Sequence, residues 1–274
     1  MIIKEQFLIS KTGNKYDCED IIFLNSNYAA IIDGATARNK RKYNGVSSGR
    51  AAAEITYKAI EKLSPVASLR EALDIITNEF NVFYKENNID IKNYADVLTA
   101  SCVLYSKNLH QIWMIGDCQC FFNNKVYSNK NGIDEHVAFV RSFINQAEIL
   151  KGHTINWVSE NDPGVDYIAK LLTEQFLFQN HIKKTYGEFA YTAIDGKYIS
   201  EKSVKVLQLN NEITEIILAS DGYPKLMATL EKSERALEKA LINDPLCIYT
   251  NKGVKGLKNG FISYDDRAYL RIIL

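Results

Sequence analysis

The chain has 274 residues, of which 46% are hydrophobic and 24% are charged. This composition is enough for a large core, and we expect one domain because no Pro-rich, Gly/Ser-rich or low-complexity linker divides the chain. Lysine plus arginine total 33 and aspartate plus glutamate total 33, so the formal net charge is zero. That balance argues against nucleic acid or a membrane surface as the partner, apart from a local charged patch.

Targeting and redox signals predict a cytoplasmic protein. The first ten residues, MIIKEQFLIS, carry two charges within a short apolar pattern and do not form a signal peptide. No apolar run approaches the ~20 residues of a membrane span. The five cysteines are odd in number and lack paired spacing, which predicts reduced thiols. Cys118 and Cys120 have a spacing that could bind a soft metal, but both fall on one strand face, and we favour buried packing.

The spacing of apolar residues predicts the elements in chain order. We expect strands over residues 3–10 and 20–33, the second bent at the turn signal Asn25-Ser26-Asn27, then helices over 47–63 and 68–87 and four strands over 96–106, 109–117, 119–124 and 125–128. We then expect helices over 134–151 and 163–180, strands over 205–210 and 212–220, a helix over 223–242 broken near Thr229, and a strand over 261–274. Ser68 and Glu71 form a capping box, and Asn123-Asn124 marks a tight hairpin. The run of hairpins favours an α+β fold, with sheet packed against sheet and helices outside.

Acidic residues stand where apolar runs begin or end. Asp33-Gly34 follows AAII, and Asp221-Gly222 follows IILAS. Each carboxylate alone is typical of a solvated cap or turn. If the strands are neighbours, however, the carboxylates cluster and repel one another unless a cation neutralises them. The full set is Glu19, Asp20, Asp33, Asp117, Asp221, Asp265 and Asp266.

The ligand type selects the cation. Carboxylate oxygens without histidine favour magnesium, manganese or calcium over zinc. None of the four histidines stands beside an Asp-Gly pair. We expect the glycine after each aspartate to let the chain turn sharply and to let its backbone carbonyl approach an ion.

These motifs, in this order, resemble those of the metal-dependent protein phosphatases of type 2C. The chain carries ED at 19–20, DG at 33–34, TASCVLY and IGD within 99–117, LASDG at 218–222 and DDRAYL at 265–270. The family runs E-D, D-G-x-G-G, a T-A strand followed by G-D-S-R, L-A-S-D-G, and D-N or D-D near the end. The resemblance spans roughly residues 1–274. It implies an antiparallel β-sandwich flanked by helices on both sides, with a two-metal site at one end.

The resemblance also implies a ligand set for two Mg²⁺ or Mn²⁺ ions and a weaker third. Asp33 is expected to bridge the two ions, and the carbonyl of Gly34 to bind one of them. The other expected ligands are Glu19 or Asp20 for the second ion, Asp221 and Asp265 for the first, and Asp117 for the third. Two such ions ~3.5–4 Å apart hold a bridging water and aim it at phosphorus in line with the leaving oxygen. The implied activity is that of a serine/threonine phosphoprotein phosphatase.

Three further positions follow from the same resemblance. Lys15 takes the place of the family's phosphate-binding arginine and keeps its charge without the bidentate fork. Asp266 takes the place of the family's Asn or Asp. Ala35 stands where some members have a histidine, so water would protonate the leaving alkoxide. Beside this site, the basic cluster of Arg38, Lys40, Arg41 and Lys42 is a candidate for holding an acidic or phosphorylated substrate.

The chain also departs from the family. D-G-x-G-G is DGATA, with Thr36 and Ala37 in place of glycines, and G-D-S-R is GDCQC. Residues 128–180 are expected to form a helical insertion or flap, and YTAIDG at 191–196 is a faint echo of the family's flap motif.

Two interpretations therefore stay open, an active phosphatase or a pseudophosphatase that acts as a binding scaffold. The retained oxygen donors favour the enzyme. A haloacid dehalogenase-type hydrolase would need a D-x-D pair, which DGAT lacks.

Overall fold

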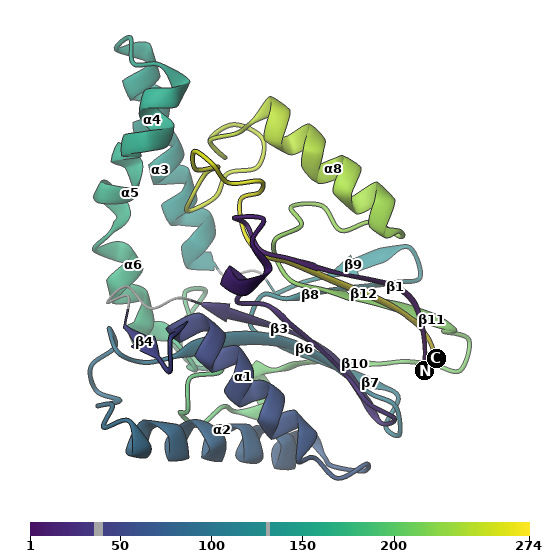
Figure 1. Cartoon of the computed structure of the whole chain (residues 1–274). Helices are drawn as coiled ribbons and strands as arrows, with labels where there is room; N and C mark the ends of the chain where they lie inside the picture. Colours follow the sequence, from purple (N-terminus) through teal and green to yellow (C-terminus); the bar gives the residue numbers. More distant parts are fainter. Residues whose placement is uncertain (36–40, 130–131) are drawn as a thin grey trace.

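The computed structural model of the chain describes residues 1–35, 41–129 and 132–274. Two five-stranded antiparallel sheets face each other (Figure 1). In spatial order, the first sheet contains β1 (Ile2–Ile9), β12 (Arg267–Ile273), β11 (Glu215–Ala219), β8 (Gln119–Phe122) and β9 (Lys125–Tyr127). The second contains β10 (Lys205–Gln208), β7 (Gln111–Ile115), β6 (Thr99–Ser106), β3 (Tyr28–Ala35) and β2 (Ile21–Leu24). A short hairpin of β4 (Lys42–Tyr43) and β5 (Val46–Ser47) lies outside both.

Helices cover both outer faces of the sandwich. The second sheet is covered by α1 (Ser48–Glu61) and α2 (Leu69–Glu86), and the first by α8 (Leu230–Asn243) (Figure 1). The predicted α+β fold, an antiparallel β-sandwich flanked by helices on both sides, is confirmed.

The two sheets meet through alternating side chains. Ile31 of β3, Val103 of β6 and Met114 of β7 share one buried cluster with Leu218 and Leu270 of the other sheet. The opposite faces of β3, β6 and β7 pack beneath α1 and α2. Because both faces of β3 are covered, its run YAAII is apolar throughout, as is typical of strands buried on two sides.

The cysteines belong to the packed interior. All five are free thiols and buried. Cys118 and Cys120 lie in the cluster between the sheets, where the Cys120 thiol is 3.9 Å from the sulfur of Met114. The packing interpretation of the C-x-C spacing is therefore confirmed.

Local signals in the sequence place several element ends. Ser47 caps α1 by accepting a hydrogen bond from the Arg50 amide. The capping box of Ser68 and Glu71 is present at the start of α2. Between β8 and β9, the two asparagines Asn123 and Asn124 have φ of 49° and 56°, the left-handed pair that a tight hairpin needs.

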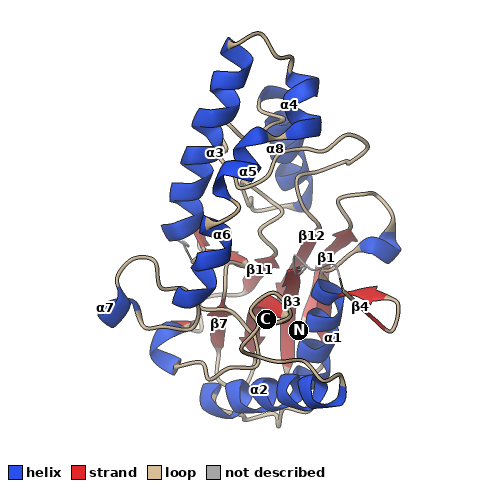
Figure 2. Ribbon diagram, turned by 90° about the vertical axis from the view of Figure 1, so that its left-hand side faces the viewer, coloured by secondary structure: helices blue, strands red, loops and turns tan. Residues whose placement is uncertain are grey.

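The remaining helices form an arm that projects from one end of the sandwich (Figures 1 and 2). The helical arm contains α3 (Gly132–Leu150), α4 (Ile155–Asn161), α5 (Pro163–Ile168) and α6 (Leu171–Glu174). Buried Arg141 anchors it, because its guanidinium binds both oxygens of Asp162 and donates to the carbonyls of Leu246 and Gly253. Within the parts of the chain that the structure describes, no helix is long and apolar enough to cross a membrane.

The predicted helix over 163–180 is wrong as one element. It is divided into α5, α6 and a 3-10 helix, η2 (Gln175–Phe178). Ile168, Leu172 and Phe178 all pack into one cluster with α3. The step from 168 to 172 fits an α-helix but the step from 172 to 178 does not, so the chain bends to bury Phe178. A short 3-10 helix, η3 (Glu201–Ser203), and α7 (Lys183–Tyr186) follow along the chain.

Two other elements begin at least six residues later than expected, and α4 was not expected. Helix α8 begins at Leu230, where the Thr229 side chain accepts a hydrogen bond from the Lys232 amide, and Pro224 disfavours a helical conformation at Tyr223, where the helix was expected to begin. Strand β12 begins only at Arg267. The residues before it face the loop after β1, whose backbone amides hydrogen-bond to the Asp266 carboxylate.

Candidate metal centre

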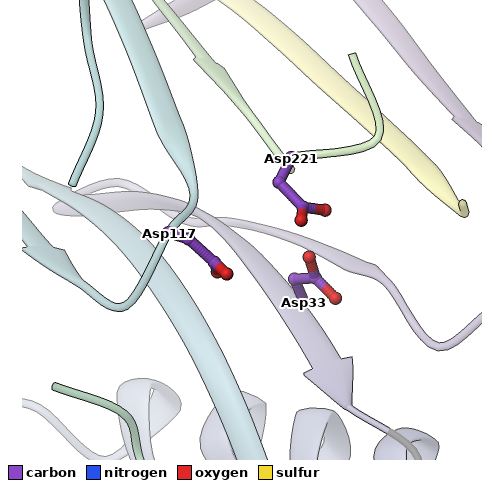
Figure 3. Close-up of side chains that lie close together, drawn as sticks. All are labelled: Asp33, Asp117 and Asp221. Carbon is purple, nitrogen blue, oxygen red and sulfur yellow. The ribbon is translucent and has the colours of Figure 1, made fainter. Parts of the chain in front are cut away.

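Three carboxylates converge at one end of the sandwich (Figure 3). Asp33 lies near the end of β3, Asp117 follows β7, and Asp221 follows β11. One oxygen from each lies within 4.8 Å of the others. The prediction that strand ends bring distant aspartates together is thus confirmed for these three residues.

Ser101 of β6 lies between Asp33 and Asp117. It pairs in register with Asp33, and its hydroxyl is 3.4 Å from the amide of Asp117. Gly116 has φ of +86°, and a Cβ there would lie 2.1 Å from the Ser101 hydroxyl. Only glycine satisfies both the left-handed turn and this close approach, so Gly116 directs the Asp117 side chain toward Asp33.

The glycine after each Asp-Gly aspartate has a different reason from the expected sharp turn. Gly34 continues β3, and a Cβ on it would lie 2.0 Å from the carbonyl oxygen of Gly49 in α1. A Cβ on Gly222 would lie 1.9 Å from the carbonyl oxygen of Asp266. Both glycines therefore let two backbones meet beside the carboxylates. The carbonyl of Gly34 as a metal ligand stays a prediction.

The cluster is electrostatically unfavourable without a cation. Burial raises the pKa of Asp33 well above its ordinary value, and the negative charges of Asp20, Asp221, Asp265 and Asp117 add to the rise. Asp221 lies at the solvent-exposed edge of the cluster, where partial desolvation and the charges of Asp117 and Asp265 raise its pKa to about 7. Like-charged carboxylates in such a site ionise together only if a positive charge offsets their repulsion.

Asp20 is completely buried and its charge acts on Asp33 of the cluster. Burial raises the pKa of Asp20 well above the ordinary value, a hydrogen bond with the Ser220 side chain opposes the rise, and the charges of Asp266, Asp265 and Asp221 add to it. A buried carboxylate among like charges is costly, and a cation nearby would relieve that cost.

Asp266 holds the loop after β1 in place. One of its oxygens accepts from the Lys11 amide at 2.8 Å, and the other accepts from the Glu19 amide at 2.6 Å. Glu19 is itself buried, accepts a hydrogen bond from the Ser47 hydroxyl, and lies 3.6 Å from the Lys11 ammonium. Asp266 thus orders the backbone that presents Glu19 and Asp20.

Asp265 is neutralised by two lysines that were not expected in the site. The Lys11 ammonium lies 3.0 Å from one oxygen, and the Lys255 ammonium bonds to the other. Burial opposes ionisation of Asp265, but the charges of Lys255 and Lys11 outweigh it and lower its pKa to about 2. For both lysines, burial acts to lower the pKa, and their attraction to Asp265 outweighs that effect and raises it.

No motif marked these lysines in the sequence. Lys11 follows the first strand, and Lys255 lies in an irregular loop that contacts Asp265 only in the folded chain. Lys15, expected to bind phosphate, lies in the exposed 3-10 helix η1 (Lys15–Asp17), with its ammonium 5.2 Å from the centre of the Tyr16 ring. The lysines that the structure places among the site carboxylates are Lys11 and Lys255.

Part of the expected basic cluster lies outside the described residues, namely Arg38 and Lys40. The same holds for Thr36 and Ala37 of the DGATA motif. The guanidinium of Arg41 donates to the Asn87 carbonyl at 3.3 Å and lies over the Tyr43 ring.

The described residues fit a hard divalent cation. Three carboxylate oxygens converge, and the charge of a fourth carboxylate, that of buried Asp20, acts on them. Oxygen-only donors of this kind suit magnesium or manganese.

Comparison with known proteins bears on the fold. No protein-family model and no curated protein sequence matches the chain. Among solved structures, the serine/threonine phosphatase Stp1 from Staphylococcus aureus is 13% identical, with 100% of this chain and 96% of that chain covered and a TM-score of 0.50. A bacterial serine phosphatase is 13% identical, with 98% and 96% covered and a TM-score of 0.50. The chain has the fold of a type 2C phosphatase. At this identity the likeness extends to the fold alone.

Proposed function

We propose that the chain is a divalent-metal-dependent phosphatase that hydrolyses phosphoserine and phosphothreonine esters in proteins. The observation that carries this proposal is the convergence of Asp33, Asp117 and Asp221 from three strand ends to within 4.8 Å. Asp33 near the end of β3, Asp117 after β7 and Asp221 after β11 match the order of motifs that resembles type 2C phosphatases. The two serine phosphatases that share the fold are consistent with the same class of reaction.

In this proposal, the three aspartates hold the cation, and Asp20 and Asp265 form a further shell of negative charge. Glu19 and the Gly34 carbonyl are proposed to contribute to a second ion. When bound, the cations would supply Lewis-acid stabilisation of the phosphoryl oxygens and an activated water. The close contacts at Gly116, Gly34 and Gly222 fix the positions of the neighbouring carboxylates Asp117, Asp33 and Asp221.

Lys11 and Lys255 are proposed to attract the phosphoryl group. Both ammonium groups stay charged at neutral pH, because their pKa values are raised by the attraction of Asp265, against the lowering effect of burial. They bring positive charge to the edge of the carboxylate cluster, where an anionic ester would enter. As point charges they orient phosphate less strictly than an arginine fork does.

A second candidate, a scaffold without turnover, is favoured by one specific observation. Both oxygens of Asp265, an expected ligand of the first ion, are already engaged by lysines, which leaves fewer carboxylates for a pair of ions. A site restricted to one ion would bind metal and phosphate without the paired-ion geometry that hydrolysis uses.

Hydrolysis of p-nitrophenyl phosphate separates the two candidates. The protein is treated with chelator and then supplied with Mn²⁺ or Mg²⁺, beside the variants Asp33→Asn and Asp221→Asn. The phosphatase proposal expects activity that returns with metal and falls to background in both variants. Metal binding without turnover of this ester or of a phosphopeptide set would favour the scaffold.

A further inference from the structure

A cavity of about 1000 Å³ opens beside the carboxylate cluster. Asp117 belongs both to the cluster and to the wall of this cavity. Ala35, which directly follows the Asp33-Gly34 pair, also lines it. A phosphoryl group held at the cluster would therefore have the rest of its molecule within reach of the cavity.

Part of the cavity wall comes from η2, which lies in the region that was expected to form one helix over 163–180. Strand β7 ends at Ile115, and beyond that end Ile194 pairs with Ala100 of β6 through two backbone hydrogen bonds of 2.8 and 2.9 Å. Residues 190–193 and the 3-10 helix η2 line the cavity. Apolar side chains from this side include Phe176 and Ile182.

Three lysines gather on the wall formed by β9, η3 and β10. They are Lys125, Lys202 and Lys205, and the Lys205 ammonium donates to the carbonyl of Ser128 just after β9. Lys125 and Lys202 are exposed. Among the described residues that line the cavity, the acidic ones are Asp117, which belongs to the metal cluster, and Asp134. Away from the cluster, the cavity therefore carries a net positive charge.

We infer that this cavity binds an acidic segment that adjoins the phosphorylated residue of a protein substrate. This inference rests on the proposed phosphatase function and adds a sequence preference to it. If cations at the cluster hold the phosphoryl group beside Asp117, the peptide continues into the cavity. The cavity volume is at the upper end of the range for small-ligand pockets, which is enough for a few side chains. Glutamate or aspartate there pairs with the three lysines, and such complementarity acts mainly on specificity and on the rate of encounter.

The test uses phosphoserine peptides of equal length that carry three glutamates on one flank, on the other flank, or glutamines throughout. The wild-type protein is compared with the triple variant Lys125→Gln, Lys202→Gln, Lys205→Gln. A matched control removes three exposed lysines remote from the cavity lining, Lys58→Gln, Lys232→Gln, Lys239→Gln, and so changes net charge equally. Two quantities are measured, kcat/KM with Mn²⁺ and the binding of labelled peptide with chelator present.

In wild type, one acidic flank is expected to raise kcat/KM about 10-fold over the glutamine peptide at low salt, mainly through KM. The preference falls below about 2-fold in the cavity variant and persists in the control. Equal kcat/KM for all peptides in wild type, or an unchanged preference in the cavity variant, overturns the inference and leaves the phosphatase proposal standing.

The binding measurement covers the case of no turnover. Lysine-dependent binding of the acidic phosphopeptide without hydrolysis would support the cavity assignment while the phosphatase proposal fails. If acidic and glutamine peptides also bind alike, the cavity assignment fails as well.

Discussion

The backbones of Gly34 and Gly49 touch, so that a Cβ on Gly34 would lie 2.0 Å from the Gly49 carbonyl oxygen. A Cβ on Gly49 would in turn lie 2.6 Å from the Glu19 carboxylate and 2.6 Å from the Gly34 carbonyl oxygen. The start of α1 therefore packs directly against β3, next to Asp33. Close packing at this point ties the helix to the candidate metal centre.

Gly49→Ala is therefore expected to lower the free energy of unfolding by about 1–3 kcal/mol, because the added Cβ meets backbone atoms of Gly34 and Ala35 in β3, which move only with the strand, and the buried Glu19 carboxylate. It is also expected to weaken Mn²⁺ binding, since Asp33 and Glu19 shift with the contact. Lys58→Ala, at an exposed position of the same helix, is the control and is expected to change stability little. Urea unfolding and metal titration of both variants check this. Equal loss of stability in both variants, with metal binding intact, would show that the contact between Gly34 and Gly49 does not position the metal ligands.

Removal of the Asp266 carboxylate is expected to loosen the loop after β1. Asp266→Ala leaves the buried amides of Lys11 and Glu19 without their acceptor, and we expect a loss of about 2–4 kcal/mol in the free energy of unfolding. Asp74→Ala, which removes an exposed pair with Arg70 on α2, is the control and is expected to cost less than about 0.5 kcal/mol. Similar costs for the two variants would show that Asp266 does not hold the loop.

Lys255 is expected to compete with metal. Its positive charge acts on Asp221 as well as on Asp265, so Lys255→Gln removes a repulsive charge from the cation site. We expect Mn²⁺ affinity to rise about 10-fold and a second ion to bind more readily. Lys252→Gln, an exposed lysine of the same loop, is the control. A drop in Mn²⁺ affinity on loss of Lys255 would contradict this role.

Metal affinity is expected to depend on pH through the cluster. Partial desolvation and the neighbouring charges raise the pKa of Asp221 to about 7, so below this pH the carboxylate binds a proton that the cation must displace. The apparent Mn²⁺ association constant then rises about 10-fold per pH unit from pH 5 to 7 for each proton released, and levels off above. In metal-free protein, the same raised pKa makes ionisation of Asp221 destabilising as pH rises from 4 to 7.

Titration calorimetry between pH 5 and 8 measures this slope. In Asp221→Asn, which has no proton to lose at this position, the slope is expected to be shallower at lower overall affinity. A pH-independent affinity in wild type would show that no ligand titrates in this range.

The sequence predicted the parts of the fold that depend on local chemistry. The capping box of Ser68 and Glu71 and the Asn123-Asn124 turn involve only residues close together in the chain. Both could therefore be predicted from the sequence. The apolar run AAII predicted a strand at β3, whereas its burial on both faces is seen only in the structure. The helical arm was harder, because Ile168, Leu172 and Phe178 are placed by a shared tertiary cluster rather than by a helical period.

The candidate site was also predictable from the sequence only in part. Asp33, Asp117 and Asp221 stand in motifs at strand ends, and the structure brings their oxygens together. Lys11 and Lys255 carry no such signal, since each meets Asp265 from a sequence-distant or irregular segment. The glycines after Asp33 and Asp221 were predicted for sharp turns, but the contacts they permit lie with Gly49 and Asp266, which sequence alone does not pair.

Calorimetric titration of the chelator-treated protein with Mn²⁺ at pH 7.5 tests the central claim most directly. The account predicts saturable binding in wild type that is lost in Asp33→Asn and in Asp221→Asn, with all three proteins equally folded by circular dichroism. Absence of saturable binding in the folded wild type, or unchanged binding in both variants, would contradict a metal centre at these carboxylates.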